Sequence, residues 1–257
     1  MGWWRRRHDD HASGVPWPAV LERRWGLWNR LPAAQQDRVV TLGREMLRQV
    51  RFEAARGFTL TDEMPVLVAA QAALLISGWD LEPGRRLEPY ARVTSVILHR
   101  STVVVRGERQ LDGDVGRLTS DAPTHLSGQA HHRGPVVLSW ASVMSDSRHP
   151  TRRKAVVLHE FAHQLDMLDG VVDGTPPFAD HGERQRFIDV CTATFTRVTD
   201  GDDEVLRDYA ATNPGEFFAV ATETFFTDPV ALRDHHALLY DVLAGYYRQD
   251  PASWTPN

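Results

Sequence analysis

The apolar residues in the first half of the chain follow a helical period and later change to short β-branched runs. A long helix is predicted from Pro32 to Gly57, because its apolar residues recur close to every 3.6 positions and Gly57 supplies a stop. A second helix is predicted after Thr61, which is a suitable N-cap residue. Its strongly apolar run to Ile76 indicates a helix inside the core.

Three short runs predict strands: Val93–Leu98, Thr102–Val105 and Pro135–Trp140. The tract 107–134 is rich in Gly, Asp, Ser and His, which is typical of a hairpin and loop. Pro135 at the start of the third run is compatible with an edge strand, and a peptide substrate could add to such an edge as a further strand. An ordinary core strand explains the same run equally well.

The second half is predicted to be mostly helical, with helices over Thr151–Leu168, Glu183–Val198, Glu216–Phe226 and Pro229–Tyr247. Together the elements predict an α+β fold, with a small mixed sheet that has an edge strand and packs on a mostly helical body. We expect residues 1–15 to form a flexible tail and residues 16–250 to form one domain. Within it, the first helices and the sheet occupy about residues 16–145, and the later helices about 150–250.

The composition narrows the function classes only a little. With 257 residues, of which 42% are hydrophobic and 25% charged, the chain can form a substantial core and is too apolar to be disordered. The net charge of -5 gives no overall attraction to nucleic acid or to an anionic membrane. The single cysteine, Cys191, excludes an intrachain disulfide and a thiolate-based zinc site, and it suits a cytoplasmic protein.

The segment with the most specific chemistry is the His-Glu-x-x-His motif of His159, Glu160 and His163. Residues four apart lie on one face of a helix, so the two imidazoles can bind a single ion. Glu160 lies about 100° further round the helix, where its carboxylate can reach a water on that ion. This geometry is typical of metal-assisted hydrolysis, in which the carboxylate accepts the proton of the water.

A third ligand is needed, and the spacing leaves several candidates open. Asp169 is chemically suitable, but no glycine turns the chain back at Asp166, so the helix should carry Asp169 away. Asp166 itself is better suited to orient a ligand imidazole, or it is an exposed carboxylate at the helix end. Glu216 follows Asn213 and Pro214 at a predicted helix start, where it could bind the metal or only complete a capping box. Glu223 is a weaker rival on the same helix.

These residues also carry a family resemblance. The segment His159–Asp166, Tyr209 with Glu216 seven residues later, and the segments Leu60–Met64 and Ala69–Ala72 together resemble the Mlc titration factor A family. These are bacterial zinc-dependent peptidases, also described as glucose-regulated metallopeptidases. The resemblance runs from about residue 20 to about residue 247. The motif and the tyrosine–glutamate spacing are also similar to the catalytic domain of anthrax lethal factor, which implies a zincin-like fold.

The resemblance implies one Zn²⁺ ion bound by His159, His163 and Glu216, with Glu160 as general base. It further implies that Tyr209 lies near the metal and donates a hydrogen bond to the oxyanion of the tetrahedral intermediate. Two imidazoles and a carboxylate can also bind cobalt, nickel or manganese, so the donor set favours zinc without excluding these ions.

Two functions from different classes follow. The motif predicts a zinc peptidase of the cytoplasm that hydrolyses peptides, with aminopeptidase activity as one form. The resemblance also implies a binding protein that sequesters a transcriptional repressor of sugar uptake. Neither function requires direct contact with nucleic acid or a membrane. A purely structural zinc site would need a fourth protein ligand, for which the sequence offers no convincing residue.

Overall fold

A small parallel sheet forms one side of the molecule. The structure, a computed structural model, describes residues 14–55, 57–82, 84–100, 134–201 and 203–254. The strands β1 (Arg51–Ala54), β2 (Ser95–His99) and β3 (Val136–Ser139) lie in the order β1-β2-β3, and both pairings are parallel. The described strands are therefore all parallel, where a mixed sheet was expected. The predicted strand Thr102–Val105 and most of the predicted hairpin tract lie outside the described residues.

Among the described residues, helices α1 (Trp17–Arg24) and α2 (Ala33–Gln49) come before β1 in the sequence, and α3 (Glu63–Ile76) lies between β1 and β2. Helix α2 ends at Gln49 and the chain continues directly into β1, so the predicted helix to Gly57 was too long. The residues of β1 are mostly exposed, and the strand exists because its backbone pairs with β2. Helix α3 begins close to the predicted start and is buried along its length.

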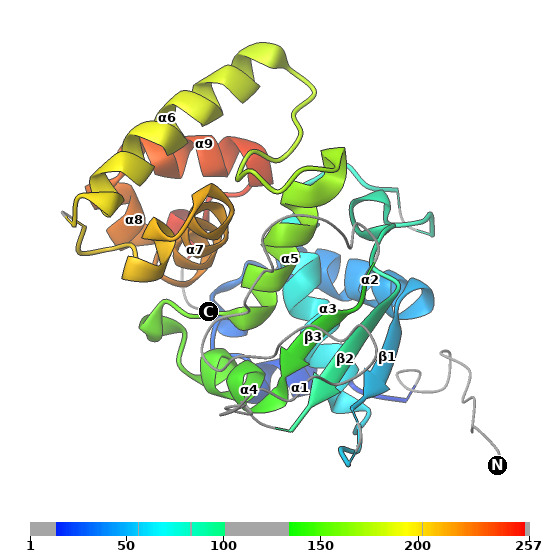
Figure 1. Cartoon of the computed structure of the whole chain (residues 1–257). Coiled ribbons are helices and arrows are strands. Elements are labelled where there is room, and N and C mark those ends of the chain that lie inside the picture. Colours follow the sequence, from blue (N-terminus) through cyan, green and yellow to red (C-terminus); the bar gives the residue numbers. More distant parts are fainter. Residues whose placement is uncertain (1–13, 56, 83, 101–133, 202, 255–257) are drawn as a thin grey trace, which may run out of the picture.

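The helices that follow the sheet in the sequence are α4 (Trp140–Arg148), α5 (Val156–Asp166), α6 (His181–Thr199), α7 (Pro214–Thr227), α8 (Pro229–His235) and α9 (Ala237–Tyr247). Figure 1 shows α6 to α9 gathered on one side and the sheet with α1 to α4 on the other. Helix α5 lies between the two groups and contacts both α3 and α7. The predicted α+β fold is confirmed, since a mostly helical chain carries one small sheet.

Later predictions differ in detail from the structure. The helix predicted over Thr151–Leu168 begins only at Val156, after a 3-10 turn, and ends at Asp166. The helix predicted over Pro229–Tyr247 is two helices, because His236 leaves the helical conformation and its ring pairs with Asp203, Nε2 to Oδ2 at 2.7 Å. Helix α4 was not predicted, and it begins where Ser139 ends β3 and caps the helix through its hydroxyl. Short 3-10 turns complete the described chain: Trp28–Arg30, Glu88–Tyr90, Pro150–Arg152, Met167–Asp169, Asp208–Ala211 and Pro251–Ser253.

The core runs through both groups of helices without a break and includes side chains from α1, α2, α3, α5, α7 and α9. None of the helices within the described ranges combines the length and the apolar character that a membrane crossing requires. The predicted N-terminal tail lies almost entirely outside the described residues.

Candidate metal site

Helix α5 presents the two histidines of the motif on one face. Both side chains are buried, and their Nε2 atoms lie 3.3 Å apart. The surrounding residues are apolar and pack into the core, which fixes the rotation of the helix: Val157, Leu158, Phe161, Ala162 and Leu165. The two imidazoles therefore face the same small volume, as the four-residue spacing predicts.

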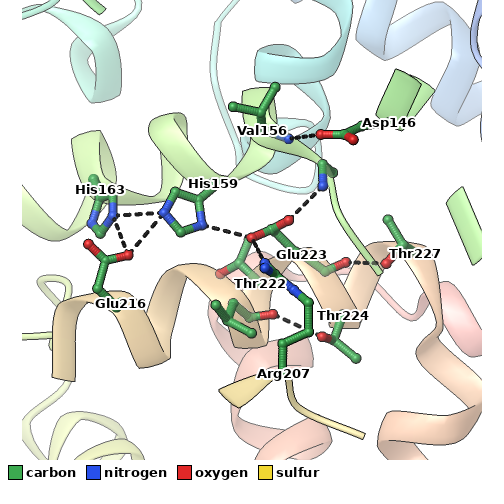
Figure 2. Close-up of polar contacts among 12 residues, drawn as sticks. Asp146, Val156, His159, His163, Arg207, Glu216, Thr222, Glu223, Thr224 and Thr227 are labelled. Atoms are coloured by element: carbon green, nitrogen blue, oxygen red, sulfur yellow. Dashed lines mark hydrogen bonds and ion pairs between the residues drawn. The ribbon is translucent and has the colours of Figure 1, made fainter. Parts of the chain in front are cut away.

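Helix α7 brings Glu216 to these histidines from a distant part of the sequence. Asn213 caps the helix, because its Oδ1 accepts the backbone N–H of Glu216 at 3.0 Å, and Pro214 occupies the first helical position. The Glu216 carboxylate is buried, and its Oε2 lies 3.0 Å from Nε2 of His159 and 3.5 Å from Nε2 of His163. Its side chain thus points at the histidines (Figure 2), so the capping-box interpretation does not account for its position.

The three side chains form a donor set of the right size for a metal ion. Ligand atoms about 2.0–2.2 Å from tetrahedral zinc lie about 3.3–3.6 Å from one another. The separations of 3.0, 3.3 and 3.5 Å come close to this edge length. Among the described residues, His159, His163 and Glu216 are the one group of three or more potential ligands that meets within 4.8 Å. We conclude that these three residues could hold one ion.

Glu223 holds the first of these histidines from the other side. Its Oε1 lies 2.7 Å from Nδ1 of His159, and its Oε2 accepts the backbone N–H of Ala155 at 2.6 Å. An imidazole that donates its Nδ1 proton has no proton on Nε2, and the lone pair of Nε2 can bind a metal. The contact with Glu223 therefore selects the metal-binding tautomer of His159. Glu223 was considered as a ligand from the sequence, but the structure gives it this orienting position.

The electrostatics of the site favour a cation. Although burial opposes the shift, hydrogen bonds with Glu216 and Glu223 raise the pKa of His159 to about 10. Burial likewise opposes a low pKa for Glu216, but hydrogen bonds with both histidines hold the pKa of this carboxyl well below its usual range. The nearby carboxylates thus favour a second proton on the His159 ring, which is normally neutral at pH 7. A metal ion can take the place of that proton.

Glu160 lies beside the donor set without being one of the three ligands. The residue is buried, and burial raises the pKa of its carboxyl to about 7, with the charge of His159 opposing the shift and those of Glu216 and Glu223 adding to it. A carboxylate with such a pKa can accept a proton and release it again near neutral pH.

Tyr209 also reaches the site, from the 3-10 turn Asp208–Ala211 just before α7. Its ring centroid is 6.0 Å from that of His159. Burial, together with the charge of Glu216 and a hydrogen bond to it, raises the pKa of the Tyr209 phenol, so the hydroxyl stays protonated and remains a donor. The structure thus brings all five predicted site residues into one region.

The two aspartates after the motif have other roles. Asp166 is fully buried at the end of α5, and its Oδ2 accepts the N–H of Gly174 at 2.9 Å. This contact holds the loop after α5 close to the start of α7. The loop passes so near that a Cβ at Gly174 (φ +76°) would lie 2.3 Å from the carbonyl oxygen of Pro214. The expectation of an exposed helix-end carboxylate is wrong. Asp169 accepts the N–H of Val171 at 3.0 Å and is not part of the donor set.

Fold and site together define an α+β protein with a buried His-His-Glu donor set on two packed helices. Residues 1–248 match the family described as Glucose-regulated metallo-peptidase M90, and the chain belongs to this family of metallopeptidases. The resemblance noted from the sequence is thereby confirmed. A metallopeptidase depends on a metal ion, and the donor set offers a place for one.

Several relatives match over most of their length. An uncharacterised protein of Synechocystis is 32% identical over 240 residues, which cover 91% of this chain and 84% of the relative. The Mlc titration factor A of Serratia proteamaculans is 30% identical, with coverage of 88% and 84%. The protein of the same name from Salmonella agona is 29% identical, with coverage of 97% and 91%.

Proposed function

We propose that the protein is a zinc-dependent peptidase that hydrolyses peptide bonds with a metal-activated water. One Zn²⁺ ion is held by His159, His163 and Glu216. The observation that supports this assignment is the approach of three buried donor atoms from two helices to within 4.8 Å of one another. The substrates are peptides, and an aminopeptidase that removes N-terminal residues is the form of the activity to test first.

The residues around the donor set have distinct roles in this proposal. Zinc, when bound, would supply a Lewis acid that lowers the pKa of a nearby water molecule to about 7. Glu160 would accept a proton from the attacking water and later pass it to the leaving amine. Tyr209 donates its hydroxyl to the oxyanion that develops at the scissile carbonyl. Glu223 keeps His159 in the metal-binding tautomer.

The test compares metal content and peptide hydrolysis in the parent and in Glu160→Gln. The amide keeps the shape of the side chain but cannot accept a proton, so hydrolysis should fall by about 10²–10⁴-fold. Zinc content should remain at one ion per chain, because Glu160 is not a ligand. Chelation should abolish parental activity and zinc should restore it. Equal hydrolysis by Glu160→Gln and the parent would refute the mechanism.

The names of two relatives support an alternative function. These relatives are called Mlc titration factor A, a name that points to binding of a repressor. We propose as an alternative that this chain sequesters a transcriptional repressor of sugar uptake without chemistry. A pull-down that compares the parent with His159→Ala separates the two, because repressor binding that survives loss of the metal supports the titration role. We also propose that residues 16–250 form one domain, whichever function holds. We propose a cytoplasmic location for the protein.

A further inference from the structure

An arginine outside the donor set contacts the residue that orients His159. The guanidinium Nη2 of Arg207 forms an ion pair with Oε1 of Glu223. This oxygen is the same one that faces Nδ1 of His159 at 2.7 Å. Figure 2 shows the resulting row of side chains from Arg207 through Glu223 to His159. A single carboxylate oxygen is therefore shared by a permanent positive charge and a predicted metal ligand.

The backbone that carries Arg207 is itself anchored. Oδ1 of Asp203 accepts the N–H groups of Val205 at 2.9 Å and Leu206 at 2.7 Å, and both of these apolar side chains are buried. From the other side, Nη1 of Arg153 donates to the carbonyl oxygens of Glu204 at 2.9 Å and Val205 at 3.1 Å. These contacts thus hold in place the stretch of backbone that leads to Arg207.

Arg153 has an unusual conformation for this task. It lies in the left-handed region at φ 56°, which costs free energy in a residue other than glycine. Its Nε also pairs with Oδ2 of Asp228, at 2.8 Å, between α7 and α8. Arg153 therefore connects the start of α5, the end of α7 and the segment that leads to Arg207.

Tyr209 follows Arg207 by two residues, so the same segment carries both the contact to Glu223 and the candidate oxyanion donor. We infer that Arg207 is a positioning residue that acts through Glu223 on the imidazole of His159 and fixes the segment that presents Tyr209. The chemical consequence rests on the proposed function. The contact itself can be tested through metal binding alone.

The physical argument concerns the freedom of Glu223. Without Arg207, Oε1 of Glu223 keeps only the His159 ring as a side-chain partner, and the carboxylate is held by that ring and by the backbone N–H of Ala155 alone. The guanidinium is always charged, so its contact through Nη2 restrains the position of Oε1. Loss of a partner that orients a metal ligand typically lowers metal affinity by about 10–100-fold.

The experiment measures cobalt affinity by competition with a chelator and records the visible spectrum of the cobalt-loaded full chain. The variants are Arg207→Met, which keeps length without charge, and Arg207→Lys, which keeps charge without the planar fork. Arg24→Met is a matched control, because Arg24 is 28% exposed and pairs with Glu63, while Arg207 is 24% exposed. The spectrum reports on ligand geometry, which a general loss of stability would not change in the folded fraction.

We expect Arg207→Met to lower cobalt affinity by about 10–100-fold and to shift the cobalt bands, with partial recovery in Arg207→Lys and no change in Arg24→Met. The decisive comparison is a double-mutant cycle with Glu223→Gln. If Arg207 acts through Glu223, the substitution at 207 should change affinity by less than about 2-fold once Glu223 is replaced. The same cycle can be run with Arg207→Lys if the methionine variant does not fold.

Additive effects in that cycle, or unchanged spectra in folded Arg207→Met, would overturn the inference. Such a result leaves the peptidase proposal intact, because the parent would still bind metal and Glu160→Gln would still lose hydrolysis. Conversely, a coupled cycle in a protein whose Glu160→Gln variant is as active as the parent would support the role of Arg207 and refute the mechanism.

Discussion

Helices α3 and α7 have the same length of 14 residues and are both buried nearly from end to end, yet their sequences differ in kind. Gln71 is the single buried polar residue of α3, and its amide donates to the hydroxyl of Ser147 at 2.9 Å. Helix α7 buries a set of polar side chains: Glu216, Thr222, Glu223, Thr224 and Thr227. Two equally buried helices can therefore have different roles, one packing the core and the other presenting polar side chains inside it.

The difference lies in how the polar groups of α7 are satisfied. The hydroxyls of Thr224 and Thr227 donate to carbonyls of their own helix, those of Val220 and Glu223. Thr222 shares a hydrogen bond of 2.7 Å with the hydroxyl of Tyr247. The two glutamates instead reach across to α5. Helix α5 thus packs between an apolar helix and a helix with carboxylates, which gives its histidines a rigid support on one side and acidic partners on the other.

The largest effect is expected from Glu216→Gln in α7. The substitution removes the negative charge and leaves an amide oxygen, which is a poor ligand for zinc, so metal binding and hydrolysis should both be lost. In the parent, zinc at 1,000 times its dissociation constant should add about 4 kcal/mol to the free energy of unfolding. Thermal unfolding with and without zinc measures this difference.

Glu63→Gln makes the same change at the start of α3 and provides the control. Glu63 pairs with Arg23 and Arg24 and lies outside the donor set, so this variant should retain the zinc-dependent rise in melting temperature. A Glu216→Gln protein that still binds one zinc ion and is stabilised by it would show that the third ligand has been assigned to the wrong residue.

A smaller effect, on stability, is expected from Leu67→Ala in α3. Leu67 is fully buried, and its truncation leaves a cavity in the core, which should lower the free energy of unfolding by about 2–5 kcal/mol. Zinc affinity and hydrolysis per folded molecule should stay close to parental values, because α3 contributes no ligand. Urea unfolding of the metal-free protein measures the loss, and a large drop in zinc affinity of the folded variant would contradict this division of roles.

The smallest effect is expected from removing one hydroxyl of α7. Thr222→Val leaves the buried hydroxyl of Tyr247 without its partner and should cost about 1–3 kcal/mol. Thr224→Val makes the same change two residues later but leaves no group stranded, because the Thr224 hydroxyl only adds a bond to a carbonyl of its own helix. We expect the second variant to lose less stability than the first in urea unfolding, because no buried group is left without a partner. Equal losses would show that the contact with Tyr247 contributes nothing.

Much of the helical framework could be predicted because its signals are local. Asn213 and Pro214 mark the start of α7, and the apolar positions of α5 and α3 define buried helices. Strand β1 could not be found in this way, because Arg51–Ala54 is short and mostly exposed and depends on pairing with β2. The break at His236 was also missed, since it depends on a buried partner, Asp203, that is distant in sequence.

The candidate site was predictable in part for the same reason. The spacing of His159 and His163 places two rings on one face, whereas the meeting with Glu216 depends on how α5 and α7 pack. Glu223 lies seven residues after Glu216, two helical turns further on the same face, and this spacing could have indicated an orienting residue. No pattern in the sequence indicates Arg207, because its contact follows from the path of an irregular segment.

Gly174 has a consequence for how this protein can change. The carbonyl oxygen of Pro214 occupies the space that any side chain there would need, and Pro214 begins the helix that carries Glu216. The separation of the two helices that carry the candidate ligands therefore depends on the smallest residue in a connecting loop outside the donor set. Adapting the centre to a larger ion would require a matched alteration of this loop, and exchanging ligands alone would leave the old spacing in place.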